Sequence, residues 1–231
     1  MGNINGENVS AQQESVAKTV WDYLGSQGFN EISRAAILGN MWQESRMRPD
    51  AMQNGPVSAE STKGGYAYGL IQWDGGRRSN LLRQLGNNWS DVNSQLDFLI
   101  SEFNGPEKGC FKRGGVYSSV NDFKNAAELS TATNQFCTCF ERAGTPNMST
   151  RISAAEYFFE AFTGTSPTSN NGQNTHGGGG RRRTEDGSAS QPFESFFEAG
   201  YLDFGDNNDL TAAMFDELVK LDDGRRINPI R

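Results

Sequence analysis

Apolar residues recur at helical spacing along the first two thirds of the chain. Val16, Val20 and Leu24 follow one another at four-residue intervals, which predicts an amphipathic helix over about 10–24. Ser10 and Gln13 have the spacing of a capping box at its start. Similar periodicity predicts further helices over about 30–45, 77–85, 90–103, 120–129, 133–142 and 149–162. The pattern therefore indicates a mainly α-helical domain.

One short segment departs from the helical pattern. Between residues 46 and 65 the apolar period is lost, and Pro and Gly residues interrupt the chain. Aromatic and β-branched residues return over 66–73, which predicts one strand of a small β-hairpin, with Asp74-Gly75-Gly76 as a turn. The expected fold class is α+β, mainly α, with one small β element.

The composition changes after the last of these predicted helices. Residues 164–191 include a long stretch that is poor in apolar side chains and rich in Gly, Asn, Thr and Arg, which is typical of a flexible linker. Residues 192–231 then carry two short helical patterns of Phe, Leu and Met. Two short helices cannot bury a core alone, so we expect this helical tail to dock on the domain or on a partner protein.

The net charge argues against one class of partner. A formal charge of −7 gives no electrostatic reason to approach nucleic acid. The only basic run, Arg181-Arg182-Arg183, lies in the predicted linker, and we interpret it as solvated rather than as a contact for nucleic acid or wall polymer. The negative charge also repels a free protein from an anionic cell wall, which favours delivery by another component.

Neither a membrane span nor an export signal is expected. No stretch of the sequence approaches the roughly 18 consecutive apolar residues of a spanning helix. Residues 1–8 lack the basic start and the apolar run of a secretory signal peptide. We therefore expect a soluble protein that is not exported through a signal peptide.

The few histidine and cysteine residues argue against several mechanisms. The sole histidine, His176, lies in the predicted linker, so a zinc amidase or a Ser-His or Cys-His hydrolase is not expected. Cys110, Cys137 and Cys139 lack the spacing of a zinc knuckle, and we interpret them as buried free thiols. One disulfide from Cys110 to either partner is the alternative for a protein that matures outside the cell. No metal or other cofactor is expected.

A carboxylate at the end of the second predicted helix is the main candidate for chemistry. Glu44 lies near the end of the segment 39–45, beside the apolar residues Met41 and Trp42. Lost hydration and the C-terminal end of the helix dipole both favour the neutral form of such a carboxyl group. A neutral carboxylic acid is suited to protonate a glycosidic oxygen, so the segment predicts a glycan-cleaving site.

Four segments together resemble the phage tail lysozyme family. They are 39–45 (GNMWQES), 68–77 (YGLIQWDGGR), 95–99 (QLDFL) and 140–144 (FERAG). The resemblance covers residues 8–163, and the Glu-Ser and Gly-Leu-Ile-Gln elements are also similar to goose-type lysozymes and lytic transglycosylases. It implies a lysozyme-like α+β domain that acts on the glycan strands of peptidoglycan. The linker and the tail lie outside it.

The resemblance also places further residues at the cleft. It implies that Gln72 and Tyr68 hydrogen-bond to sugar hydroxyl and N-acetyl groups. Trp73 can stack on the apolar face of a sugar, although the sequence favours a core position for this residue. Ser45 is expected to hydrogen-bond at the helix end, with a role in substrate binding as the second reading.

The identity of a second catalytic carboxylate is open at this point. Asp74 follows the Gln-Trp element and can stabilise an oxocarbenium ion or activate water, but turn chemistry explains Asp74-Gly75 equally well. Asp50 and Glu60, in the preceding loop, are rivals. Without a second carboxylate, Glu44 alone can serve as acid and then base in a lytic transglycosylase, where a hydroxyl of the substrate replaces water.

These observations predict a peptidoglycan-degrading glycosidase of the muramidase type. We expect it in a phage tail or a related injection device, where it opens the cell wall locally, with residues 192–231 joining tail or device proteins. A lytic transglycosylase that uses the same Glu44 is the first alternative. A catalytically silent structural tail protein or glycan-binding protein is the alternative of another class.

Overall fold

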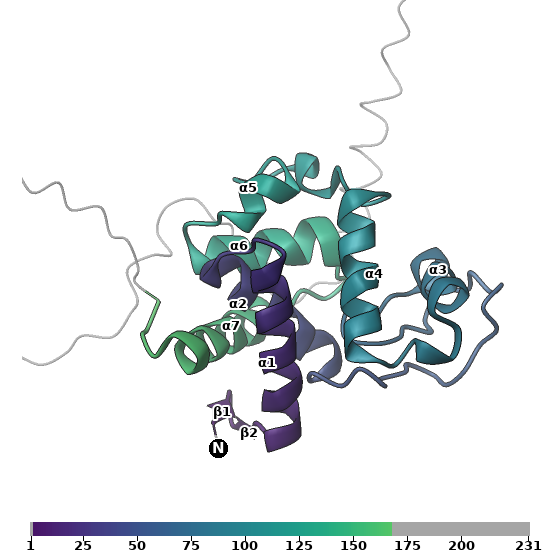
Figure 1. Cartoon of the computed structure of the whole chain (residues 1–231), viewed down its shortest axis with the longest axis horizontal. Helices are drawn as coiled ribbons and strands as arrows, with labels where there is room; N and C mark the ends of the chain where they lie inside the picture. The colour runs from purple at the N-terminus through teal and green to yellow at the C-terminus, as the bar shows by residue number, and fades with distance from the viewer. Residues whose placement is uncertain (1, 168–231) are drawn as a thin grey trace, which may run out of the picture. The chain divides into compact units, whose positions relative to one another are not determined.

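Helix α2 (Glu31–Ser45) is the central element of the domain. In the computed structural model, which describes residues 2–167, α2 packs most extensively against α7 and next against α6. Figure 1 shows these helices together with α1 in one helical body. The elements in chain order are β1 (Asn3–Ile4), β2 (Glu7–Asn8), α1 (Ala11–Ser26), α2 (Glu31–Ser45), α3 (Gly75–Leu85), the 3₁₀-helix η1 (Gly86–Asn88), α4 (Val92–Asn104), the 3₁₀-helix η2 (Cys110–Arg113), α5 (Val120–Lys124), α6 (Leu129–Phe136), the π-helix η3 (Cys137–Glu141) and α7 (Met148–Thr163).

The capping chemistry read from the sequence defines the start of α1. The backbone N–H of Gln13 donates to Oγ of Ser10 at 3.2 Å, and the backbone N–H of Ser10 donates to Oε1 of Gln13 at 2.8 Å. This reciprocal pair satisfies N–H groups that have no partner inside the helix. The predicted capping box is confirmed, and the helix continues slightly beyond its predicted end, to Ser26.

The helix predicted over 120–129 ends early, and the helix predicted over 133–142 begins early. Helix α5 ends at Lys124, whose carbonyl oxygen accepts from the backbone N–H of Asn30 at 2.8 Å. The side chain of Asn30 also donates to the carbonyl oxygen of Ala126 at 2.7 Å. The chain after α5 therefore turns aside to pair with the start of α2, and α6 begins at Leu129.

The small β element lies elsewhere than predicted. Tyr68 forms only isolated antiparallel bridges, with Met52 and with Trp73, so 66–73 is not a strand of a hairpin. Residues 69–72 make the turn, while Asp74 is the N-cap of α3 and Gly75 its first residue. The two-stranded antiparallel sheet is instead β1–β2 near the N-terminus. The class, mainly α with a small hairpin, is confirmed, but the position predicted for the hairpin is wrong.

A buried side chain explains why residues 69–72 form a turn without a ladder. The Gln95 side chain accepts from the backbone N–H of Leu70 at 2.8 Å and donates to the carbonyl oxygens of Pro49 and Trp89, both at 2.7 Å. A Cβ atom on Gly69 would lie 2.6 Å from Oε1 of Gln95, and the φ of Gly69 is 77°. The position therefore requires glycine for both reasons.

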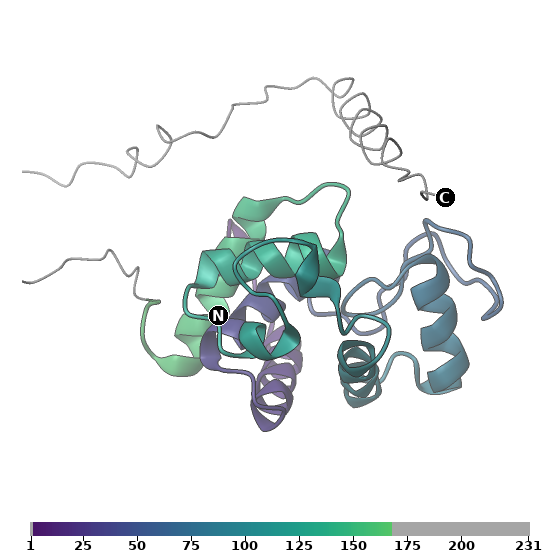
Figure 2. The same ribbon diagram turned by 90° about the horizontal axis from the view of Figure 1, so that it is seen from above.

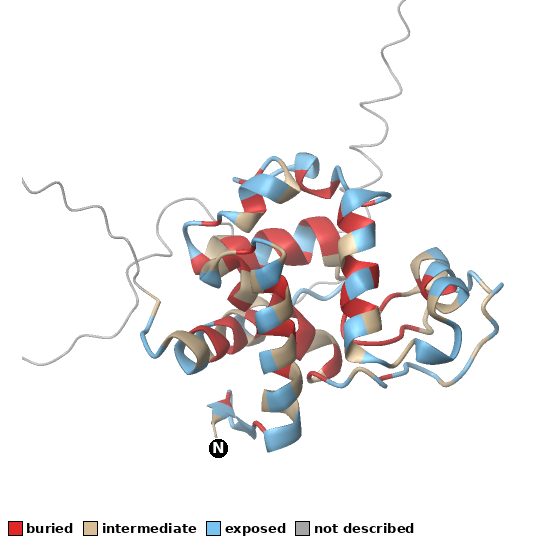
Figure 3. Cartoon of the chain, in the orientation of Figure 1, coloured by how far each residue is buried: buried red, intermediate tan, exposed pale blue. Residues whose placement is uncertain are grey.

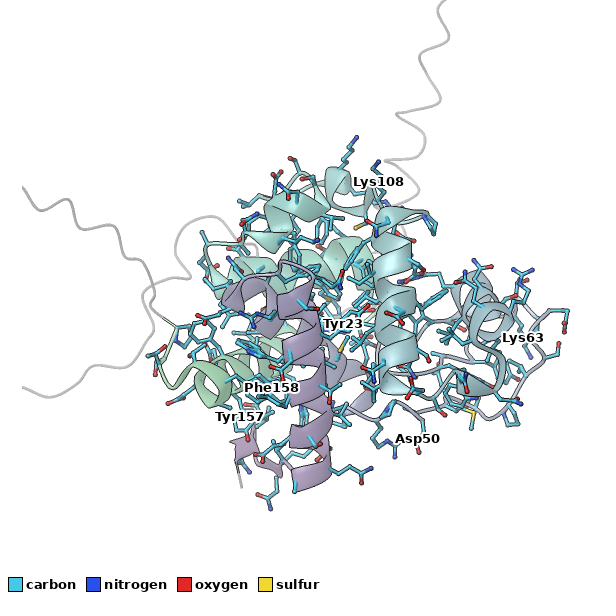
Figure 4. All side chains as sticks on the ribbon, in the orientation of Figure 1. Tyr23, Asp50, Lys63, Lys108, Tyr157 and Phe158 are labelled. Atoms are coloured by element: carbon cyan, nitrogen blue, oxygen red, sulfur yellow. The ribbon has the colours of Figure 1, made fainter. Side chains whose placement is uncertain are left out.

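The packing of α2 on α7 forms the centre of the core. Figure 3 shows buried residues on these two helices and also on α6 and α4. Phe158 of α7 meets Trp42 of α2 edge to face, with ring centroids 6.1 Å apart. Its neighbour Tyr157 donates a hydrogen bond to Oε1 of Glu14 in α1 at 2.7 Å (Figure 4). Helix α7 is thereby fixed against both α1 and α2.

The irregular segment that joins α2 to α3 lies, together with α3, to one side of this helical body in two perpendicular views (Figure 1, Figure 2).

Among the described residues, no helix is long and apolar enough to cross a membrane. The three cysteines, Cys110, Cys137 and Cys139, are buried and free. Most of the predicted linker, including His176, and all of the predicted tail over 192–231 lie outside the described residues.

Gly39 sets the closeness of α2 and α7. A Cβ atom built on it lies 2.3 Å from the carbonyl oxygen of Arg151 and 2.8 Å from Cβ of Ala155. We expect Gly39→Ala to lower the free energy of unfolding by about 1–3 kcal/mol, because backbone must shift to admit the methyl group. Urea unfolding followed by circular dichroism measures this. Gly76→Ala in α3 is the matched control, since a Cβ atom built on Gly76 meets nothing within 4 Å. Equal stability of Gly39→Ala and the wild type would contradict the expectation.

Candidate active site

Glu44 lies in the last turn of α2 and lines a polar pocket of about 580 Å³. The pocket is closed by the turn before α3, the start of α3 and the segment that follows η3. It is lined by Glu44, Gln53, Ala67, Ile71, Gln72, Asp74, Arg77, Glu141, Arg142, Ala143 and Gly144. The structure thus brings together three residues predicted from the sequence: Glu44, Gln72 and Asp74.

The carboxyl group of Glu44 is held by a buried guanidinium group. Nη2 of Arg151 donates to Oε1 of Glu44 at 2.6 Å, and the Arg151 side chain is 2 % exposed. Nη1 of Arg151 donates to Oδ1 of Asn40 at 2.9 Å, and its Nε donates to the carbonyl oxygen of Pro146 at 2.6 Å. Each nitrogen of the guanidinium group is therefore hydrogen-bonded, as burial of a charge requires.

The environment of Glu44 differs from the expected one. Met41 and Trp42 are fully buried inside the helical body, whereas the Glu44 side chain keeps 20 % of its exposure and contacts Arg151. The reason is helical geometry: Glu44 shares with Asn40 the face of α2 that points to Arg151, one turn apart. The prediction that Glu44 has apolar surroundings is therefore wrong, although Glu44 does line a pocket.

The carboxylate of Asp74 accepts hydrogen bonds from the backbone around it. Its carboxylate accepts from the backbone N–H groups of Gly65 at 2.7 Å, Tyr66 at 3.1 Å and Gly75 at 2.7 Å. Burial alone would raise the pKa of Asp74, but these three donors and the charge of Arg78 lower it. Asp74 is therefore an anion that caps α3 and closes the loop, and its role as second catalytic group stays a prediction.

A second hollow of about 540 Å³ adjoins the first. Glu44 and Gln72 line both, and Ser45 lines the second. Oγ of Ser45 donates to the carbonyl oxygens of Met41 at 3.0 Å and Leu70 at 3.1 Å, as expected of a hydrogen bonder at a helix end. Because the hollows share two residues, they lie on either side of Glu44 and Gln72, and we refer to them together as the groove.

The groove includes a contribution from the N-terminal hairpin, which the sequence did not predict. Glu7 of β2 lines the second hollow and pairs with Arg46, whose Nε lies 2.8 Å from Oε2 of Glu7. Gln72 adopts φ 51° between the two hollows, in the left-handed region that a residue with a side chain adopts at a cost. Its Nε2 donates to the carbonyl oxygen of Gly69 at 3.0 Å.

Two predicted substrate-binding residues lie in the core beside the groove. Tyr68 is 2 % exposed, and its hydroxyl accepts from the backbone N–H of Val57 at 3.0 Å. Trp73 is 1 % exposed, and its Nε1 donates to Oε2 of Glu102 at 2.7 Å. Neither residue lines the two hollows, so contact of Tyr68 or Trp73 with substrate stays a prediction without support from the geometry. Asp50 lines a different hollow near the start of α1.

Comparison with known proteins identifies the family. The family model for phage tail lysozyme matches residues 15–162, which is more than half of the chain. The chain belongs to the phage tail lysozyme family. It is also 29 % identical over 161 residues to Morphogenesis protein 1 of Bacillus phage B103, an alignment that covers 66 % of this chain and 40 % of that relative. The chain thus spans about 40 % of the length of the curated relative it matches.

The pocket of this phage tail lysozyme domain contains a further carboxyl group that sequence reasoning missed. Glu141 ends the π-helix η3, and its Oε1 is buried without a hydrogen-bond partner among the described residues. Burial first, and then the nearby negative charge of Glu44, raise the pKa of Glu141 well above its usual range. The segment 140–144 is the part of the sequence that could have indicated Glu141. It contributes to the family resemblance, but the sequence analysis gave none of its residues a role.

The residues on both sides of Glu141 are anchored. Phe140 is fully buried, and the guanidinium carbon of Arg77 lies 4.4 Å from the centre of its ring. Arg142 forms a two-pronged ion pair with Glu107, at 2.9 and 3.0 Å. Since both neighbours are fixed, the backbone at Glu141 and the direction in which its side chain starts are fixed as well. A π-helical turn at such a position is common at functional sites.

Removing the guanidinium group from α7 tests its part in the site. We expect Arg151→Met to lower the free energy of unfolding by about 3 kcal/mol, the low end for a broken buried pair, because Glu44 keeps some contact with water. Thermal and urea unfolding measure this. Lys18→Met removes the exposed Lys18–Asp22 pair and is expected to change stability far less. Similar effects of the two variants would contradict the structural role of Arg151.

Proposed function

We propose that this domain cleaves the glycan strands of peptidoglycan as a muramidase, with Glu44 as the general acid. The observation that carries the proposal is the place of Glu44 at the junction of two polar hollows. An extended sugar chain needs a groove that continues on both sides of the bond to be broken. Glu44 has such a groove on either side, and membership of the phage tail lysozyme family supports the substrate class.

The chemistry follows from the poor leaving group. A glycosidic oxygen leaves as an alkoxide unless a carboxylic acid protonates it, and the sugar then carries positive charge as an oxocarbenium ion. Negative charge in the pocket stabilises that ion, and Arg151 holds the carboxyl group of Glu44 in one direction. The bonds between Arg151 and Asn40 keep this arrangement rigid.

The biological setting is a proposal of the same kind. We infer that the protein acts at the bacterial cell wall as part of a phage tail or related injection device. The family description and the name of the B103 relative, a morphogenesis protein, both support a role within a phage particle. Residues 192–231 are proposed to join neighbouring tail or device proteins.

A lytic transglycosylase is the second candidate. The observation that favours it is the occupation of Asp74 by three backbone N–H groups, which leaves this carboxylate little freedom to activate water. Mass spectrometry of digested peptidoglycan distinguishes the two reactions. A muramidase leaves a reducing sugar, whereas a transglycosylase leaves an anhydro sugar.

We expect Glu44→Gln to reduce the rate of peptidoglycan cleavage by about 10²–10⁴-fold, because the amide keeps the shape of the side chain and cannot supply a proton. Release of soluble fragments from purified peptidoglycan measures the rate. Glu156→Gln, at an exposed position of α7 outside the groove, is the matched control. If folded Glu44→Gln cleaves peptidoglycan as fast as the wild type, the catalytic site lies elsewhere. If the wild type itself does not cleave peptidoglycan, the silent structural or glycan-binding alternative is favoured.

A further inference from the structure

On the basis of the proposed function, we propose that Glu141 holds the catalytic proton while the pocket is empty of substrate. Glu141 and Glu44 then form a pair of carboxyl groups that shares this proton. Both side chains line the pocket of about 580 Å³, and they come from helices that are far apart in the sequence. Glu141 is then the second carboxyl group that the reaction lacks when Asp74 is occupied.

The first support is the state of the Glu141 carboxyl group. Its Oε1 is buried and has no donor within reach among the described residues. A carboxylate in such a place loses its hydration without gaining hydrogen bonds, which is costly, whereas a neutral carboxylic acid loses much less. The geometry therefore favours a proton on Glu141.

The second support is the balance of charge behind the pocket. Glu102 binds Arg77 through two hydrogen bonds, both at 2.8 Å, and Glu44 binds Arg151 at 2.6 Å. Glu141 is the third carboxyl group near these two guanidinium groups, and each guanidinium group is already paired. Three carboxylates against two guanidinium groups leave one negative charge in excess. The other charged groups of the pocket do not offset it, since Arg142 is paired with Glu107 and Asp74 with Arg78. A proton on Glu141 removes this excess.

Asp74, in the same pocket, holds no proton by the same reasoning. Its carboxylate accepts three backbone N–H groups. Hydrogen bonds of this kind stabilise the charged form of a carboxylate. The raised pKa of Glu141, which burial causes and the charge of Glu44 increases, agrees with this assignment.

The proton balance of the reaction is then complete. As the bond from the anomeric carbon to the glycosidic oxygen breaks, its electron pair stays with the oxygen, which takes the proton from the pair. Water, or a hydroxyl of the substrate in a transglycosylase, adds to the anomeric carbon. The proton that the attacking group loses returns to the pair, so the carboxyl groups end as they began.

The test is the pH dependence of cleavage by full-length Glu141→Gln. Activity of the wild type is present while Glu141 carries its proton and is lost as the pH rises through the raised pKa of Glu141. Glu141→Gln removes the carboxyl group whose pKa is raised, so the loss of activity moves to lower pH. We expect a rate about 10²–10⁴-fold below wild type at neutral pH that recovers toward wild type on acidification.

The outcomes separate this inference from the proposed function. Active wild type and inactive Glu44→Gln, together with an unchanged pH profile of Glu141→Gln, would overturn the role of Glu141 while the glycosidase stands. A loss that is equal at every pH would also overturn it, because a purely structural defect does not depend on one proton. An inactive wild type overturns the proposed function, and with it the catalytic use of the proton.

A spectroscopic measurement reads the proton without relying on activity. The infrared difference spectrum between wild type and Glu141→Gln at neutral pH should contain the C=O stretch of a protonated carboxyl group, shifted in D₂O. Glu160→Gln, a control on the same helix as Arg151, should give no such band, since Glu160 is exposed. Absence of the band from the wild-type minus Glu141→Gln spectrum would overturn the resting position of the proton.

Discussion

The buried guanidinium group of Arg151 is the constraint on which the domain depends. A charge without access to water must have each of its donors satisfied, and the partners of Arg151 come from α2 and from the chain just before α7. This requirement fixes the register of α7 on α2, at the place where Gly39 allows the closest approach. Asn40 extends the network to α6 through the carbonyl oxygen of Thr133. The carboxyl group of Glu44 completes it, so the same interaction joins the core and positions the proposed acid.

The opposite wall of the groove is built on another principle. Residues between α2 and α3 form almost no backbone ladder, and buried polar side chains take over its function. Arg78 is fully buried and donates to the carbonyl oxygens of Ser61, Lys63 and Tyr66, while Gln95 binds the turn at Leu70. Each bond satisfies a main-chain group that a sheet would otherwise satisfy. The irregular wall is therefore specified by side chains of α3 and α4.

The carboxyl groups around the groove differ because their surroundings differ. Asp74 receives three main-chain donors, Glu102 shares a guanidinium group and an indole, and Glu44 has Arg151. Glu141 has none of these at its buried oxygen. Environments that push the proton affinities of neighbouring acids apart are the general way in which one site provides both acid and base at the same pH.

The sequence alone determined most of the helices, the capping box of α1 and the place of Glu44 near the end of α2, because these depend on interactions between residues a few positions apart. It also determined the family, through short segments that include Glu44 and Glu141. Only the tertiary structure decided that Glu44 binds Arg151, 107 positions away, that Asp74 caps α3, and that Glu141 enters the pocket unpaired. Local spacing contains no information on these contacts, since they arise where helices distant in the chain pack and each buried polar group must find a partner or lose its charge.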